Sequence, residues 1–380
     1  MGRPARETPF GEAARAQQLF SRSPLASGGS TGALVQNPLA KGERLNGAPV
    51  SAYNRQHHTR FTLRSHAMKF LFQWASALAL TAAILVPAGA QKKERDVFNY
   101  VGQKKAGKDV KRIVFIAAQE GHGGKGNHEF KAGAIYLART LNATYPNVFA
   151  VVYKNTNWPK DVSDADCIIV LLNHGGPAAT NKSIQAAVKR GAGFMAIHYG
   201  VEVNKGAQGD NFLKWIGGYF ETGWSVNPHW VAKFDKIPEH ETTRGVKPFA
   251  VNDEWYYHMR FVPDMKGVTP VLSAVPSLKT VQGGGKTTSA RGGNPAVYEA
   301  VKAKIPQHVA WAYVRPDGGR GFGFTGYHNY SNLANDSFRT LLLNAAAWTS
   351  GLEIPANGIA SKTLTKDDLE KLYQDGLRVP

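Results

Sequence analysis

The chain has 380 residues, a formal net charge of +18, a hydrophobic fraction of 43% and one cysteine, Cys167. The hydrophobic fraction fits a globular domain, and a single cysteine excludes an intrachain disulfide. Because Cys167 stands in the apolar run Asp-Cys-Ile-Ile-Val-Leu-Leu, we expect a buried, inert thiol rather than a nucleophile. The positive charge can attract polyanions, but no nucleic-acid-binding motif accompanies it, so we predict no nucleic-acid partner.

The segment Met68–Ala90 has the three parts of a secretory signal peptide: a basic start at Lys69, an uncharged apolar run, and the small-residue ending Ala-Gly-Ala. Because such a signal works at an N-terminus, we expect residues 1–67 to be an upstream or disordered leader and the mature protein to begin near Gln91. The prediction is a secreted or periplasmic protein that meets the membrane only through its export signal. The alternative is a single-pass anchor with a basic cytoplasmic tail, which the ending disfavours.

Residues 91–110 form a basic stretch typical of a linker, and an α/β pattern begins at Lys111. Apolar runs and amphipathic stretches then alternate, with strands predicted at 113–117, 148–153, 167–172 and 193–198 and helices at 129–141 and 182–190. Such alternation is typical of a parallel sheet covered by helices on both faces. In such sheets, ligands bind beyond the carboxyl ends of the strands.

The second half of the chain is less regular. A helix is predicted at 211–220, mixed strands and long loops at 223–310, and a flexible glycine-rich segment at 282–294. Because those glycines do not link a strand to a helix, they predict no nucleotide-binding loop. The remaining elements complete one domain, residues 111–352, with a C-terminal extension, residues 353–380: strands at 308–314 and 321–325, a helix at 336–348 and a short capped helix after Thr365.

Histidines occur repeatedly where predicted strands end. His128 lies with His122 in the loop after the first strand, His198 ends the strand Gly-Phe-Met-Ala-Ile-His, and His328 follows Gly-Phe-Gly-Phe-Thr-Gly-Tyr. In a parallel sheet these positions meet at one edge, where imidazoles can bind a metal ion or exchange protons. His229, in Asn-Pro-His-Trp, is a further candidate. For each histidine, the alternative is a hydrogen-bonded loop residue.

Two adjacent carboxylates precede an aromatic cluster, in the order Asp253, Glu254, Trp255, Tyr256 and Tyr257. Neighbouring residues of a strand point to opposite faces, so at most one carboxylate should enter a site. Aromatic rings with polar tips beside a carboxylate suit a sugar, whose ring faces stack and whose hydroxyl groups need acceptors. A core position for Trp255 and its neighbours is equally open.

Five motifs in chain order together resemble the trehalose-utilisation, or ThuA-like, family over about residues 111–352. They are Ala-Ile-His-Tyr-Gly (196–200), Gly-Gly-Tyr-Phe (217–220), His-Glu-Thr-Thr-Arg-Gly (240–245), Asp-Glu-Trp-Tyr-Tyr (253–257) and Gly-Arg-Gly-Phe-Gly-Phe-Thr-Gly-Tyr-His (319–328). The chain departs from the family pattern after Phe220, where Glu-Thr-Gly-Trp replaces the usual Gly-His-Pro, and His229 is a candidate to compensate.

The resemblance implies a class I glutamine amidotransferase-like fold, which is a flavodoxin-like three-layer α/β sandwich with a mostly parallel sheet, and a link to sugar metabolism. In that fold the nucleophilic cysteine occupies the turn where His198 stands, and the catalytic histidine follows a late strand, about where His328 lies. The place of the site carries over. The amidotransferase reaction does not, because an imidazole replaces the thiolate.

We therefore expect an exported carbohydrate-active lyase, hydratase or hydrolase that acts on a glycoside or keto-glycoside. His198, His328 and either His128 or His229 would hold a divalent metal, zinc or manganese, and Glu254 would be the general base beside the catalytic histidines. Substrate contacts are expected from His128, Asp253, Trp255, Tyr256 and Tyr257. The alternative is a non-catalytic carbohydrate-binding or cell-surface protein that uses the same crevice for a small carbohydrate.

Overall fold

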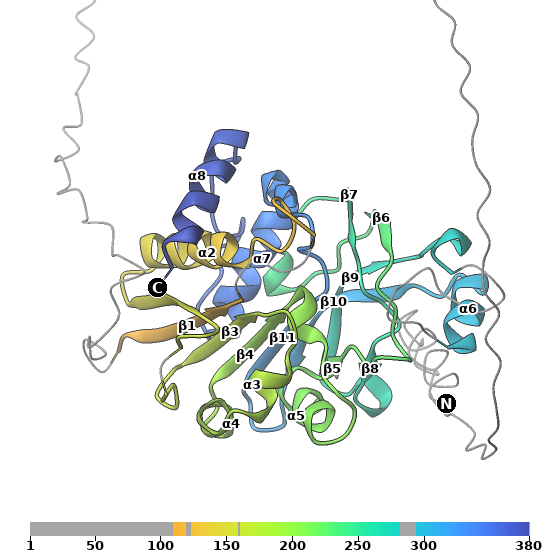
Figure 1. Ribbon diagram of the computed structural model, residues 1–380, viewed down its shortest axis with the longest axis horizontal. Coiled ribbons are helices and arrows are strands. Elements are labelled where there is room, and N and C mark those ends of the chain that lie inside the picture. The colour runs from red at the N-terminus through yellow and green to blue at the C-terminus, as the bar shows by residue number, and fades with distance from the viewer. Residues whose placement is uncertain (1–108, 119–122, 159, 282–293, 380) are drawn as a thin grey trace, which may run out of the picture. The chain divides into compact units, whose positions relative to one another are not determined.

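The computed structural model describes residues 109–118, 123–158, 160–281 and 294–379 (Figure 1). The predicted leader, signal peptide and most of the linker lie outside these residues, as do His122 and most of the glycine-rich segment. Within the described ranges, no helix is long and apolar enough to cross a membrane.

A seven-stranded sheet forms the centre of the fold, in the order β2-β1-β3-β4-β11-β10-β9. The first five strands in this order pair in parallel, whereas β10 runs antiparallel to both β11 and β9. The strands are β1 (Lys111–Ala117), β2 (Val148–Lys154), β3 (Cys167–Leu171), β4 (Gly193–Ile197), β9 (Val268–Ala274), β10 (Gln307–Val314) and β11 (Arg320–Phe324). The apolar runs of the sequence thus predict the parallel strands to within one or two residues at each end.

Helices cover both faces of this sheet (Figure 1). One face is covered by α2 (Phe130–Thr144) and α7 (Asp336–Thr349), with α8 (Lys366–Leu377) packed on α2; the other is covered by α3 (Gly176–Thr180), α4 (Lys182–Lys189) and α5 (Ala207–Ile216). The predicted three-layer α/β sandwich is confirmed. The helix predicted at 211–220 is displaced, because α5 begins earlier and Gly217, with φ 75°, ends it in the left-handed conformation.

The irregular section between α5 and β10 contributes two small antiparallel sheets and a short helix. Strands β5 (Gly218–Tyr219) and β8 (Arg260–Phe261) pair, as do β6 (His229–Phe234) and β7 (Phe249–Glu254), and α6 spans Pro295–Lys302. In the second pair, His229 stands opposite Glu254 and Trp230 opposite Asp253. This pairing brings the carboxyl end of β7 to the site described below.

The hydrophobic core lies on both faces of the central sheet, where every residue of β3 and β4 is buried. Cys167 is the first residue of β3 and is fully buried, and burial raises the pKa of its thiol to about 12. A thiol in this state is protonated at physiological pH, as expected for an inert core residue.

Candidate metal centre at the carboxyl edge of the sheet

Four side chains converge beyond the carboxyl ends of the central strands. His128, His198, Glu254 and His328 each offer one donor atom, and these atoms all lie within 4.8 Å of one another. Nε2 of His128 and Nε2 of His198 are 3.1 Å apart, and Oε2 of Glu254 lies 3.5 Å from Nε2 of His198 and 3.1 Å from Nδ1 of His328. Around a tetrahedral Zn²⁺, bonds of about 2.0–2.1 Å place neighbouring donors roughly 3.3 Å apart. The predicted convergence of the three histidines is confirmed, and the group could hold a metal ion.

The sheet topology explains why two of these histidines meet. Strands β4 and β11 are parallel neighbours, with Ile197 opposite Phe324, so His198 and His328 both follow the same edge of the sheet. His128 stands in the loop after β1, two residues before α2 begins. His128 and His198 have φ values of 57° and 52°, in the left-handed region that few non-glycine residues adopt. Such strain persists where surrounding structure imposes it, often at functional sites.

The cluster is buried at its base and partly open on one side. His128 and His198 are fully buried, whereas the side chains of Glu254 and His328 are 13% and 10% exposed. Burial alone would raise the pKa of Glu254, but hydrogen bonds and charge from His198 and His328 outweigh it and hold this pKa well below its usual range. Glu254 is therefore an anion among imidazoles, which suits a cation site reached from the side of Glu254 and His328.

Neighbouring groups orient the donors. Nδ1 of His198 lies 2.8 Å from the carbonyl oxygen of Thr325. Because a carbonyl can only accept, this contact places a proton on Nδ1 and turns Nε2 toward the cluster. The amide of Asn227 donates to Oε1 of Glu254 at 2.9 Å, which leaves Oε2 facing His198 and His328.

Asp253 lies next to Glu254 in the sequence but is not one of the four donors. Its carboxylate is fully buried and turns away from the cluster, as the alternation along a strand predicts for the neighbour of Glu254. It accepts hydrogen bonds from the backbone N–H groups of Glu254, Tyr327, His328 and Asn329 and from the side chain of Asn332, at 2.8–3.1 Å. These contacts fix the loop that carries His328, and a substrate contact of Asp253 stays a prediction.

The three aromatic residues after Glu254 divide between core and site. Trp255 is fully buried and packs against Phe234 and Phe324, and the hydroxyl of Tyr257 lies 2.7 Å from that of Thr280. These contacts give Trp255 and Tyr257 the core position that their sequence also allowed. Tyr256 alone reaches the cluster, where its hydroxyl lies 3.4 Å from both His198 and Glu254.

His229 lies beside the four-donor group but is not one of its members. It is exposed at the start of β6, and its ring centroid lies 4.6 Å from that of His328. The sequence left the third histidine of the group open between His128 and His229. The fully buried His128 is the one that belongs to the group.

Glu202 is a site residue that the sequence analysis missed. It is 2% exposed and directly follows the 3-10 turn His198–Val201. Burial and the nearby charge of Glu254 raise the pKa of Glu202 to about 7. The hydrogen bond that Glu202 accepts from Thr222 at 3.0 Å acts in the opposite direction but is outweighed. One feature of the sequence could have pointed to a buried carboxylate here: Glu202 stands between two valines, four residues after the strand-end histidine His198.

Comparisons with known proteins bear on the family of the chain. The family model described as trehalose utilisation, ThuA, matches residues 121–349. No curated protein matches the chain. Among solved structures, the chain is similar to a ThuA-like protein from Bacteroides uniformis, with 17% identity and a TM-score of 0.44 over 66% of this chain and 95% of that one.

Two further solved structures show weaker likeness. PurLQS from Thermotoga maritima has 13% identity and a TM-score of 0.35 over 63% of this chain and 97% of that one. An exo-beta-1,4-mannosidase from Opitutaceae bacterium strain TAV5 has 13% identity and a TM-score of 0.30 over 65% of this chain and 36% of that one. The family model, in contrast, covers more than half of the chain and all four donor residues. The chain therefore belongs to the ThuA, or trehalose utilisation, family.

Proposed function

We propose that this protein is an exported, metal-dependent carbohydrate-active enzyme that acts on a glycoside or a keto-glycoside by elimination, hydration or hydrolysis. The buried group of His128, His198, Glu254 and His328 carries the proposal, because three imidazoles and one carboxylate form a donor set that suits Zn²⁺ or Mn²⁺. The sugar substrate is supported by the family's description, trehalose utilisation. Export is supported by the signal-like segment Met68–Ala90.

The burial of each site residue suggests its role in binding the cation or the substrate. A divalent cation held there would supply a Lewis acid that polarises a carbonyl or hydroxyl oxygen of the sugar. The buried imidazoles of His128 and His198 would form the base of the site, and the substrate would approach past Glu254 and His328, whose side chains are partly exposed. Tyr256 would donate its hydroxyl to a sugar oxygen.

Proton transfer can be assigned in two ways. If the three histidines suffice to hold the cation, the ionised Glu254 is free to act as the general base. If Glu254 completes the donor set, Glu202 is the carboxyl group best suited to exchange a proton, because its pKa of about 7 leaves both of its forms populated near neutral pH.

The first test is the metal content of the purified protein, measured by elemental analysis beside His198→Ala, His328→Ala and His229→Ala variants. We expect near-stoichiometric zinc or manganese in the unmodified protein, loss of the metal in the first two variants, and retention in His229→Ala, since His229 lies outside the four-donor group. Metal-loaded protein would then be screened with glycosides and keto-glycosides.

A protein that stays free of metal after dialysis against zinc and against manganese would contradict the proposal. Sugar binding without turnover in such a preparation, unaffected by Glu254→Gln, would instead identify a non-catalytic carbohydrate-binding protein.

A further inference from the structure

The C-terminal helix α8 lies outside the residues that match the family model, yet it contacts both loops that carry metal donors. The ammonium group of Lys125, in the loop before His128, lies 2.9 Å from Oε2 of Glu370 and 4.7 Å from the ring centroid of Tyr373. On the other loop, the hydroxyl of Tyr330 donates to the carbonyl oxygen of Leu369 at 3.0 Å. Here "the donor loops" means residues 123–128 and 327–330.

The donor loops are also bonded to each other. The N–H of His128 donates to the carbonyl of His328 at 2.9 Å, and the N–H of Tyr330 donates to the carbonyl of Gly126 at 3.0 Å. Asn127 and Asn329 form an antiparallel bridge between these contacts. Because the two loops form one hydrogen-bonded unit, a helix that holds either loop limits the movement of both.

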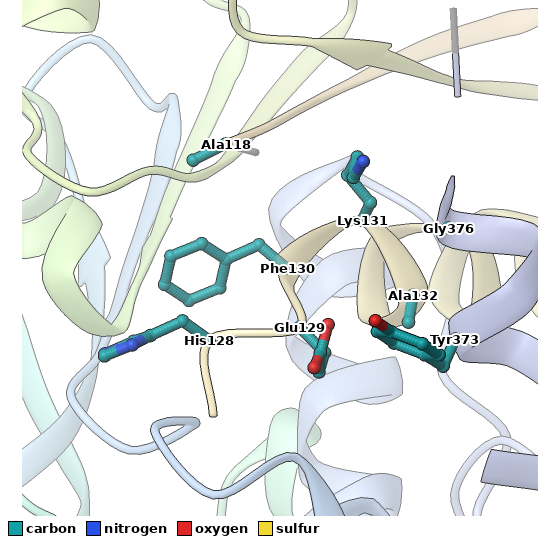
Figure 2. A pocket seen from close by; sticks show the side chains of 8 residues that line it. All are labelled: Ala118, His128, Glu129, Phe130, Lys131, Ala132, Tyr373 and Gly376. Carbon is teal, nitrogen blue, oxygen red and sulfur yellow. The ribbon is translucent and has the colours of Figure 1, made fainter. Parts of the chain in front are cut away.

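Helix α8 is itself packed along α2. Arg139 and the buried Asp375 form an ion pair at 2.5 Å. A Cβ atom at Gly376 would lie 3.1 Å from the backbone nitrogen of Ala132, so the two helices pack closely here and leave little room for a side chain. Figure 2 shows Tyr373 and Gly376 of α8 beside the first turn of α2, which contains Ala132. His128 lies just before this turn in the chain. The support for the donor loops thus rests on a packed helix pair.

We propose that α8 sets the spacing of the metal donors, with Lys125 and Tyr330 as the positioning residues that transmit its effect. The proposal rests on the proposed metal site. Metal affinity depends on donors that are already held at the required separation, and loss of groups that orient ligands commonly weakens binding by about 10–100-fold. The exposed ion pair of Lys125 contributes little by itself. The buried hydroxyl of Tyr330 is therefore expected to be the stronger of the two contacts.

The experiment uses the full chain and the double variant Lys125→Met/Tyr330→Phe, which removes the polar contacts and keeps the bulk of both side chains. The matched control is Lys362→Met, which removes the ion pair between Lys362 and Asp368 near the start of α8 without touching the donor loops. Two quantities are measured: the Zn²⁺ dissociation constant by competition with a chelator, and amide hydrogen exchange of the donor loops in metal-free protein. If the double variant fails to fold, Tyr330→Phe alone replaces it.

We expect the double variant to bind Zn²⁺ about tenfold more weakly or worse and to exchange the amides of His128 and Tyr330 faster, whereas Lys362→Met matches the unmodified protein in both. Unchanged exchange of the donor loops in the double variant would overturn the proposal, as would an unchanged dissociation constant in a protein that binds the metal. If the unmodified protein binds no metal, the proposed function fails, and faster loop exchange in the double variant would still support the role of α8.

Discussion

At the scale of single residues, the site depends on two carboxylates that stand side by side in the sequence and do different work. Glu254 faces the histidines and is held ionised by them. Asp253 faces the opposite way and accepts four backbone N–H groups and one side-chain amide. A carboxylate has about four lone-pair positions and no proton to donate, so it satisfies a set of donors that an uncharged residue of the same shape cannot.

Replacing Asp253 by asparagine tests this role. The amide keeps the shape but turns an NH₂ group toward N–H donors, so we expect the free energy of unfolding to fall by about 3 kcal/mol. Urea unfolding of metal-free protein would measure the change. The exposed Asp235 offers a control, since Asp235→Asn should shift this free energy by less than about 0.5 kcal/mol. Equal unfolding midpoints for the two variants would show that Asp253 does not hold the loop.

Glu202 provides a second prediction at this scale. Its pKa of about 7 in the folded protein exceeds the ordinary value of 4.5, so the folded state binds a proton that the unfolded state releases. The stability that this adds is present below pH 4.5 and is lost as pH rises through about 7. The free energy of unfolding should therefore fall less between pH 5 and pH 8 in the Glu202→Gln variant than in the unmodified protein. Urea unfolding of metal-free protein would measure this difference. A variant with the same loss over this range would contradict the assignment.

At the scale of elements, six of the seven strands of the central sheet could be predicted from the sequence, whereas β9 and the details of the site could not. Apolar runs such as 167–171 leave little choice, because a strand buried on both faces must be apolar throughout. Four of the five partners of Asp253 lie 74–79 residues further along the chain, and no local pattern marks such contacts. The small sheets β5–β8 and β6–β7 also join residues that are distant in the sequence, and their short strands give no clear period.

The same reasoning explains the outcome for the aromatic residues. Trp255, Tyr256 and Tyr257 are alike in type, and sequence cannot distinguish a ring that fills the core from one that reaches a site. Packing decides: Trp255 is enclosed by Phe234, Phe324 and Phe338, while the ring of Tyr256 lies 4.7 Å from that of His198.

The pairing of β10 with β11 allows an element-scale prediction. Gly323 stands opposite Trp311, and a Cβ atom at this position would lie 2.1 Å from the indole ring, far inside van der Waals contact. Gly323→Ala should therefore force the two strands apart, lower the free energy of unfolding by about 2 kcal/mol or more, and weaken metal binding through displacement of His328. Denaturant unfolding and Zn²⁺ titration would measure these effects. A variant with normal stability would mean that Trp311 moves aside easily.

At the scale of the whole molecule, two buried histidines outside the four-donor group predict how stability responds to acid. Burial lowers the pKa of His258 and of His308 to about 4, from 6.5 in an exposed chain. The unfolded state therefore takes up these protons first, so stability falls as pH drops from about 6.5 toward 4, by up to roughly 3 kcal/mol for each histidine.

Unfolding by urea at pH 7 and pH 4.5 would check this expectation. The His308→Gln variant should show a smaller acid-induced loss of stability than the unmodified protein. The Glu202→Gln variant should not, because the pKa of Glu202 is shifted in the opposite direction from that of His308. An acid-induced loss of the same size in His308→Gln would show that other groups govern the response.

The burial of Cys167 also makes the chain convenient for chemical labelling. Because the sequence contains no other cysteine and this thiol lies inside the sheet, its rate of alkylation reports the opening of the whole core. A cysteine introduced at an exposed position beside the donor loops would then be the one thiol that reacts in the folded protein. A fluorescent or spin label could be attached there without removing any native residue of the core, and it would follow movement of the donor loops separately from unfolding.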